Sequence, residues 1–113
     1  MKLIPLDILK TYWGYDQFKP SQELAVNSIL RQKDTCVFLP TGGGKSICFQ
    51  VPALVEPGIC IVISPLVALM QDQVENLKSR GIKAQLLKSG MSHVEVDQRL
   101  ENCIKGKKKI TNL

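Results

Sequence analysis

The sequence has no apolar run long enough to cross a membrane. A spanning helix needs roughly 18 or more consecutive apolar residues, and polar or charged residues interrupt every apolar stretch well before that length. The first residues, Met1 to Asp7, also lack the long apolar core and small-residue cleavage site of a secretory signal. These absences predict an intracellular protein, in the cytoplasm or nucleoid of a bacterium or the nucleus of a eukaryote.

The sequence also lacks the cysteine and histidine spacing of a metal site. Its cysteines, Cys36, Cys48, Cys60 and Cys103, form no Cys-x-x-Cys pair, and the single histidine, His93, stands at no ligand spacing from them. A disulfide framework is equally unexpected in a reducing compartment. We therefore expect no zinc centre, and cysteines that are mostly small buried apolar residues.

Acidic residues are scarce in the last third of the chain. Residues 77–113 hold nine Lys or Arg and three Asp or Glu, whereas the first 76 residues hold six and seven. A basic surplus of this kind is compatible with contact to a polyanion, although most basic surplus is simply solvated surface. The run at residues 107–109 is of this second kind.

Apolar periodicity predicts an α/β fold with three parallel strands and flanking helices. The first two segments are helical, and strands then alternate with helices, which implies right-handed crossovers. The expected strands are residues 35–39, 59–63 and 84–87. The expected helices are residues 5–12, 21–32, 45–53, 64–80 and 92–105. The run at 59–63 is apolar at every position, which predicts a strand covered on both faces. Ser21, Ser64 and Ser92 are the expected N-caps.

The decisive segment is residues 40–46, Pro-Thr-Gly-Gly-Gly-Lys-Ser, between a predicted strand and a predicted helix. Gly42, Gly43 and Gly44 have no Cβ, so backbone N–H groups can converge on phosphate oxygens, and the following helix directs its positive end to the same place. The Lys45 ammonium would neutralise the outer phosphates, which makes it the candidate catalytic residue. The Ser46 hydroxyl is a suitable Mg²⁺ ligand. This loop predicts binding of ATP with Mg²⁺, with Thr41 as a further loop contact.

The loop and two other segments resemble the RecQ family of superfamily 2 helicases. The loop has the family's Thr-Gly-Gly-Gly-Lys-Ser form, with Leu39 at the position of the usual first glycine. The segment Phe-Lys-Pro-Ser-Gln at 18–22 resembles the family's base-binding motif, and residues 64–74, with their Asp-Gln-Val ending, resemble the next helicase motif. The resemblance implies the N-terminal portion of a RecA-like ATP-binding domain over residues 1–113. Residues 1–33 would carry the adenine-motif helices and residues 34–113 the phosphate-loop core, with an incomplete sheet.

The resemblance also implies roles for individual residues. Gln22 would hydrogen-bond the adenine edge, and Tyr15 and Lys19 would sandwich the ring, with Lys19 where the family usually has Arg. Ser64 and Gln73 would contact DNA, as would Ser89. The implied activity is ATP-driven 3′–5′ unwinding of DNA, acting on single strands and duplex junctions in repair or recombination.

One motif that such an ATPase needs is missing. The family's Asp-Glu-x-His, which would hold Mg²⁺ and orient the attacking water, occurs nowhere in the 113 residues. We therefore expect a truncated helicase fragment, inactive alone. A non-catalytic nucleotide-binding module and an RNA-directed superfamily 2 helicase fragment are alternatives. A small-molecule kinase is disfavoured by the triple glycine.

Overall fold

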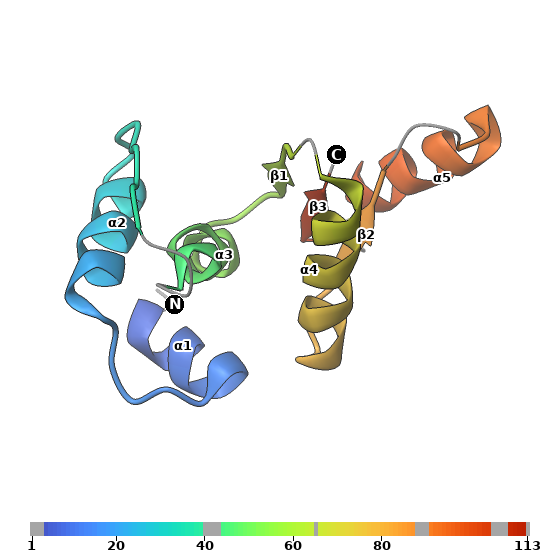
Figure 1. The fold of residues 1–113 in the computed structure, drawn as a ribbon. Helices are drawn as coiled ribbons and strands as arrows, with labels where there is room; N and C mark the ends of the chain where they lie inside the picture. The colour runs from blue at the N-terminus through green and yellow to red at the C-terminus, as the bar shows by residue number, and fades with distance from the viewer. Residues whose placement is uncertain (1–3, 40–43, 65, 88–90, 105–108, 113) are drawn as a thin grey trace. The chain divides into compact units, whose positions relative to one another are not determined.

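The computed structural model describes residues 4–39, 44–64, 66–87, 91–104 and 109–112. They fall into two compact units, Met1–Pro57 and Gly58–Leu113. The first unit holds three helices, and the second holds two helices and three parallel strands (Figure 1). The predicted α/β class, with three parallel strands and flanking helices, is confirmed and is consistent with part of a RecA-like domain.

The first unit is built from α1 (Pro5–Trp13), α2 (Pro20–Leu30) and α3 (Lys45–Val55). Gly14 ends α1 with a φ of 75°, and its N–H donates to the Leu9 and Lys10 carbonyls, which is typical of a glycine that closes a helix. Each helix contributes to one apolar cluster, in which Leu9, Val26 and Val51 are almost completely buried. This cluster fixes α2 and α3 together, and the candidate site lies where these two helices begin.

Two details of the first unit differ from the sequence expectation. Residues 35–39 are not a strand, because they form no backbone ladder with any described strand, and a strand needs a neighbour to satisfy its peptide groups. Helix α2 starts one residue early, with Pro20 as its first residue, so the N-cap is Lys19 instead of Ser21. Leu24 is 74% exposed, whereas Val26 belongs to the core.

The second unit contains a three-stranded sheet of β1 (Cys60–Val62), β2 (Ala84–Leu86) and β3 (Ile110–Asn112). The order is β1-β3-β2, and both pairings are parallel, with Ile110 level with Cys60 and with Ala84. Strands β1 and β2 lie within the predicted runs. Strand β3 was not predicted, and it takes the third place in the sheet that residues 35–39 were expected to fill.

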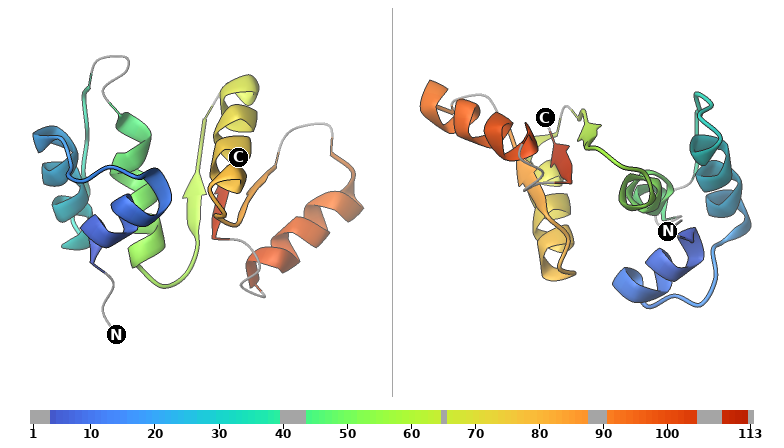
Figure 2. Two further views of the ribbon diagram at one scale, coloured as in Figure 1. Left: turned by 90° about the horizontal axis from the view of Figure 1, so that it is seen from below. Right: turned by 180° about the vertical axis from the view of Figure 1, so that it is seen from behind.

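Two helices cover opposite faces of this sheet, α4 (Val67–Ser79) and α5 (His93–Ile104) (Figure 2). The Asn112 side chain donates to the Met70 carbonyl on α4, whereas the Gln85 side chain donates to the Arg99 carbonyl on α5. Gln85 is level with Thr111, which is the neighbour of Asn112, and neighbouring residues of one strand point to opposite faces of the sheet. These two bonds therefore place α4 and α5 on different sides. That is the arrangement right-handed crossovers require when the chain passes from β1 to β2 and back to β3.

The start of α4 and the exposure of β1 also differ from expectation. Helix α4 begins at Val67 with Leu66 as N-cap, so Ser64 precedes the helix instead of capping it. Ile61 and Ile63 are 57% and 82% exposed, so the described residues do not cover β1 on both faces. The Ser92 prediction is confirmed, because its Oγ accepts the Glu95 N–H at 3.2 Å. Among the described helices, none is long and apolar enough to span a membrane.

Candidate functional site

A hollow of about 290 Å³ in the first unit joins the starts of α2 and α3. This volume is near the lower end of the range for small-molecule sites, about 300 to 1,000 Å³. Its lining is Tyr15, Gln17, Lys19, Gln22, Gly44 and Ile47. The structure thus brings the three predicted base-binding residues, Tyr15, Lys19 and Gln22, together with the last glycine of the phosphate loop.

The Gln22 side chain connects the two halves of this hollow. Its Oε1 accepts the Lys19 backbone N–H at 2.9 Å, and its Nε2 donates to the Gly44 carbonyl at 3.1 Å. Gln22 is 4% exposed, so these bonds satisfy an amide that would otherwise be costly to bury. A glutamine amide has two N–H donors and two acceptor lone pairs, so among the described residues one donor and one lone pair have no partner.

Gly44 has the backbone conformation that the loop needs at its junction with α3. Its φ is 77°, in the left-handed region that glycine adopts without strain. A Cβ at this position would lie 2.2 Å from the Gln22 Nε2. Both the backbone angle and the close side chain therefore require glycine here.

The beginning of α3 presents donors for an anion. Gly44 is its N-cap and no described side chain caps the helix, so the positive end of the helix dipole lies at this residue. Lys45, the first residue of α3, is exposed, and Ser46 follows it, half-buried. This donor set fits a phosphate group with an oxygen-ligated Mg²⁺. Thr41, Gly42 and Gly43 lie outside the described residues.

Two lining residues, Gln17 and Ile47, were not identified from the sequence. Ile47 belongs to the buried apolar cluster, so it ties the floor of the hollow to the core. Its position three residues after Gly44, one turn into the expected helix, was the signal that could have identified it. Cys48 lies close by, with its Sγ 4.0 Å from the Gly44 carbonyl, and burial raises the pKa of its thiol.

The candidate DNA-binding residues belong to the second unit. Ser64 follows β1, and its Oγ accepts the Leu66 N–H at 3.3 Å. Gln73 is half-buried on α4, and its Oε1 accepts the Asn112 Nδ2 at 3.3 Å. Ser89 lies outside the described residues. Both described candidates therefore take part in hydrogen bonds within the second unit.

Within the described part of the chain, no three His, Cys, Asp or Glu side chains gather as a metal-binding group. Ser46, which the sequence predicts as a Mg²⁺ ligand, would act together with phosphate oxygens. Such sharing is usual for Mg²⁺, which is commonly held by few protein ligands and by the phosphates of its substrate.

Comparison with known proteins gives one family and a set of similar helicases. Residues 19–112 match the family model described as DEAD/DEAH box helicase. The chain is 48% identical over 94 residues to the ATP-dependent DNA helicase RecQ of Synechocystis sp., covering 83% of this chain and 20% of that protein. It is 44% identical over 105 residues to RecQ of Bacillus subtilis, covering 91% and 18%. A putative ATP-dependent DNA helicase Q1 of Caenorhabditis elegans is 41% identical over 100 residues, covering 88% and 16%. The chain therefore spans a fifth or less of the length of these relatives.

Proposed function

The chain belongs to the DEAD/DEAH box helicase family and is homologous to RecQ DNA helicases, and from this premise we propose that it supplies ATP binding to an ATP-dependent 3′–5′ DNA helicase of RecQ type. The parent activity would couple ATP hydrolysis to movement along single-stranded DNA and to duplex unwinding. An intracellular role in DNA repair or recombination follows from this proposal.

The observation that carries the proposal is the position of Gln22. Its amide lies in the hollow with Tyr15 and Lys19 and also bonds the Gly44 carbonyl at the start of the phosphate-binding helix. One hydrogen bond thus joins Gln22, which would bind the edge of the base, to Gly44, the last glycine of the phosphate loop. The remaining N–H donor and lone pair of Gln22 match N7 and the N6 amino group of adenine. This pairing favours an adenine nucleotide over other phosphate ligands.

The other first-unit residues have complementary roles in the proposal. Tyr15 is half-exposed and Lys19 is exposed at the rim of the hollow, where they can flank an aromatic base. Lys45 would neutralise the outer phosphates, and the Ser46 hydroxyl would help to hold Mg²⁺. Bound Mg²⁺ supplies charge stabilisation for the terminal phosphate. Thr41, Gly42 and Gly43 would add backbone and side-chain contacts from the loop.

The proposed DNA contacts are Ser64, Gln73 and Ser89, in the second unit. Ser64 and Ser89 follow β1 and β2, and in parallel α/β sheets ligands bind at the carboxyl ends of the strands. An RNA substrate is the alternative, and competition between single-stranded DNA and RNA of the same length tests it. Stronger competition by RNA would contradict the DNA assignment.

We propose further that the 113-residue chain by itself binds ATP without hydrolysing it. Its sequence contains no Asp-Glu-x-His, and the metal-holding carboxylates and water-orienting group of a phosphate-loop ATPase are therefore missing from it. A non-catalytic nucleotide-binding module would also lack this motif, and it is the second candidate. The two differ in whether a longer protein containing this chain hydrolyses ATP.

Calorimetric titration of the chain with ATP and Mg²⁺ tests the binding proposal. We expect ATP to bind more tightly than GTP, and Lys45→Ala to remove most of the affinity. Lys10→Ala is the matched control, because Lys10 is exposed on α1 and does not line the hollow. Equal affinity for ATP and GTP would contradict adenine reading by Gln22. DNA-stimulated turnover that Lys45→Ala abolishes would contradict the claim that the chain alone is inactive.

A further inference from the structure

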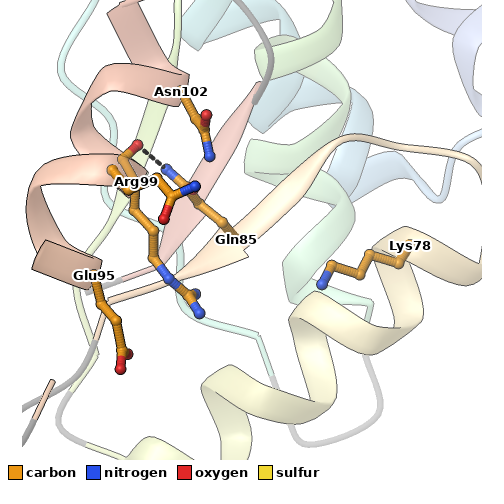
Figure 3. Close-up of a pocket in the computed structure, with 6 residues that line it drawn as sticks. Lys78, Gln85, Glu95, Arg99 and Asn102 are labelled. Atoms are coloured by element: carbon orange, nitrogen blue, oxygen red, sulfur yellow. Dashed lines mark hydrogen bonds between the residues drawn. The ribbon is translucent and has the colours of Figure 1, made fainter.

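A second hollow, of about 320 Å³, lies in the second unit at the outer edge of β2 (Figure 3). Its lining comes from α4, β2 and α5: Lys78, Gln85, Glu95, Gln98, Arg99 and Asn102. None of these residues has a role in the nucleotide or DNA contacts proposed above. Among the described residues, every side chain of the lining ends in a charged or amide group.

Hydrogen bonds hold the floor of this hollow in a fixed arrangement. Gln85 is 3% exposed, and its Nε2 donates to the Arg99 carbonyl at 2.8 Å and to the Thr111 Oγ1 at 3.1 Å. These bonds tie α5 to the two neighbouring strands β2 and β3. The polar groups on α5 are therefore presented from a helix whose position on the sheet is set by buried contacts.

Arg99 also closes the edge of β2. The Lys83 carbonyl accepts the N–H groups of Lys109 and Ile110, and the Leu87 N–H donates to the Asn112 carbonyl. Because peptide groups alternate in direction along a strand, the intervening Leu86 carbonyl points away from β3. An Arg99 Nη1 donates to this outward carbonyl. The guanidinium is thus held at the hollow, with further N–H donors in its fork.

The charges and donors of the hollow suit an oxygen anion. Lys78 approaches from α4 and Arg99 from α5, so two cations face the hollow against one carboxylate, that of Glu95 (Figure 3). The side-chain amides of Gln98 and Asn102 add neutral donors. A cation would meet a net positive lining, and the side-chain composition therefore favours a phosphate or a carboxylate.

We propose that this hollow binds a backbone phosphate of a nucleic acid strand, as a contact additional to Ser64, Gln73 and Ser89. The choice of a phosphate over a carboxylate rests on the proposed DNA-directed function. Residues 77–113 also carry nine Lys or Arg against three Asp or Glu, so the surrounding segment attracts a polyanion. Arg99 and Lys78 then fix where on that segment one phosphate sits.

The amide groups of the hollow provide a local readout. In the full 113-residue chain labelled with ¹⁵N, the side-chain NH₂ signals of Gln98 and Asn102 are followed while short oligothymidylate is added. We expect these signals to shift, and Lys78→Gln to reduce the shifts and lower the salt slope of binding by about 0.7, the value for one single-strand phosphate contact. Glu95→Gln should strengthen binding, because it removes the opposing carboxylate.

Lys83→Gln is the matched control. Lys83 is exposed in the same unit and carries the same charge, but it does not line the hollow. Equal losses in Lys78→Gln and Lys83→Gln would show diffuse attraction and overturn the proposal.

Oligothymidylate that shifts signals near Ser64 but leaves Gln98 and Asn102 unchanged would overturn it too, while the proposed function stands. Inorganic phosphate that shifts the same amides at an equal phosphate concentration would assign the hollow to a free anion instead. If the oligonucleotide binds nowhere on the chain, the result contradicts both this phosphate site and the proposed DNA contacts. ATP binding is measured separately and would not be affected.

Discussion

The Nε2 of Gln22 lies 3.1 Å from the carbonyl oxygen of Gly44, across 22 positions of sequence. This bond joins the first turn of α2 to the residue that starts α3. The same amide accepts the Lys19 N–H, so it holds both ends of the hollow in place. Changes at either residue should therefore alter nucleotide binding and stability together.

Gln22→Glu should weaken both properties. A carboxylate still accepts the Lys19 N–H but cannot donate to the Gly44 carbonyl, and loss of a buried donor costs about 1 to 3 kcal/mol. We expect urea denaturation to show a loss in this range and calorimetry to show weaker ATP binding. Asn27→Asp makes the same amide-to-carboxylate change on the exposed face of α2 and should alter neither strongly. Wild-type affinity in Gln22→Glu would contradict the assigned role.

Gly44→Ala should destabilise more than Gly58→Ala. Both positions have positive φ, 77° and 96°, and an L-residue in this region costs roughly 1 to 2 kcal/mol. The Gly58 Cβ would meet open space, whereas the Gly44 Cβ would displace the Gln22 amide. Loss of that hydrogen bond adds about 1 kcal/mol. Equal unfolding free energies for the two variants would show that the Gln22 contact contributes nothing.

Asn112→Leu should leave stability almost unchanged, within about 1 kcal/mol. Asn112 is 1% exposed, its Nδ2 bonds are long at 3.3 and 3.4 Å, and its Oδ1 has no hydrogen-bond partner among the described residues. Replacing a poorly satisfied amide with an apolar group of similar size changes the free energy of unfolding very little. Gln85→Leu is the contrast, because Gln85 makes two shorter hydrogen bonds, to the Arg99 carbonyl at 2.8 Å and to the Thr111 Oγ1 at 3.1 Å, and their loss should cost about 1 to 3 kcal/mol. The reverse order in chemical denaturation would contradict this view of the sheet.

Stability should fall as the pH rises into the alkaline range. Burial raises the pKa of both the Cys48 and Cys60 thiols, and Lys109 offsets part of the effect at Cys60. Native thiols then hold their protons more tightly than unfolded ones. The stabilisation is complete below about pH 8.5 and is lost as the pH rises through the folded-state pKa. Urea denaturation at several pH values measures this, and a double Cys48→Ala, Cys60→Ala variant should lose that part of the slope. A stability that rises over this interval would contradict the prediction.

Alkylation rates give a second measure of the same burial. Cys36 is exposed, whereas Cys48 is buried and Cys60 is half-buried. A thiolate is the reacting form, so buried thiols with raised pKa react slowly. Iodoacetamide labelling followed by mass spectrometry should modify Cys36 first. Comparable rates at Cys36 and Cys48 would show that α3 opens readily.

Sequence patterns predicted the parts of this fold that local chemistry determines. Ser92 caps α5 as expected, and the run at β2 is a strand, because a side-chain cap and an apolar run act over a few residues. The clustering of Tyr15, Lys19, Gln22 and Gly44 was predicted from the resemblance of the base-binding motif and the phosphate loop to one family.

Partners distant in sequence determined what could not be predicted. Residues 35–39 have the composition of a strand but no described neighbour to pair with, whereas the short segment of β3, with its polar Thr111 and Asn112, pairs on both sides. The strand propensity of a residue describes how well its side chain fits a half-buried pleated surface. It does not say which strand will lie beside it. The hydrogen bond between Gln22 and Gly44 is equally non-local, and no spacing rule indicates it.

The Arg99 contact with the Leu86 carbonyl makes the two margins of the sheet unequal. At β2 the outward carbonyl is already engaged and the strand residues are buried. At β1 the described residues provide no second neighbour, and Ile61 remains largely exposed. A strand added beside β2 would have to displace the Arg99 guanidinium from the Leu86 carbonyl. A strand added beside β1 meets no such contact among the described residues and would cover Ile61, so β1 is the margin that favours strand pairing with a further segment or another molecule.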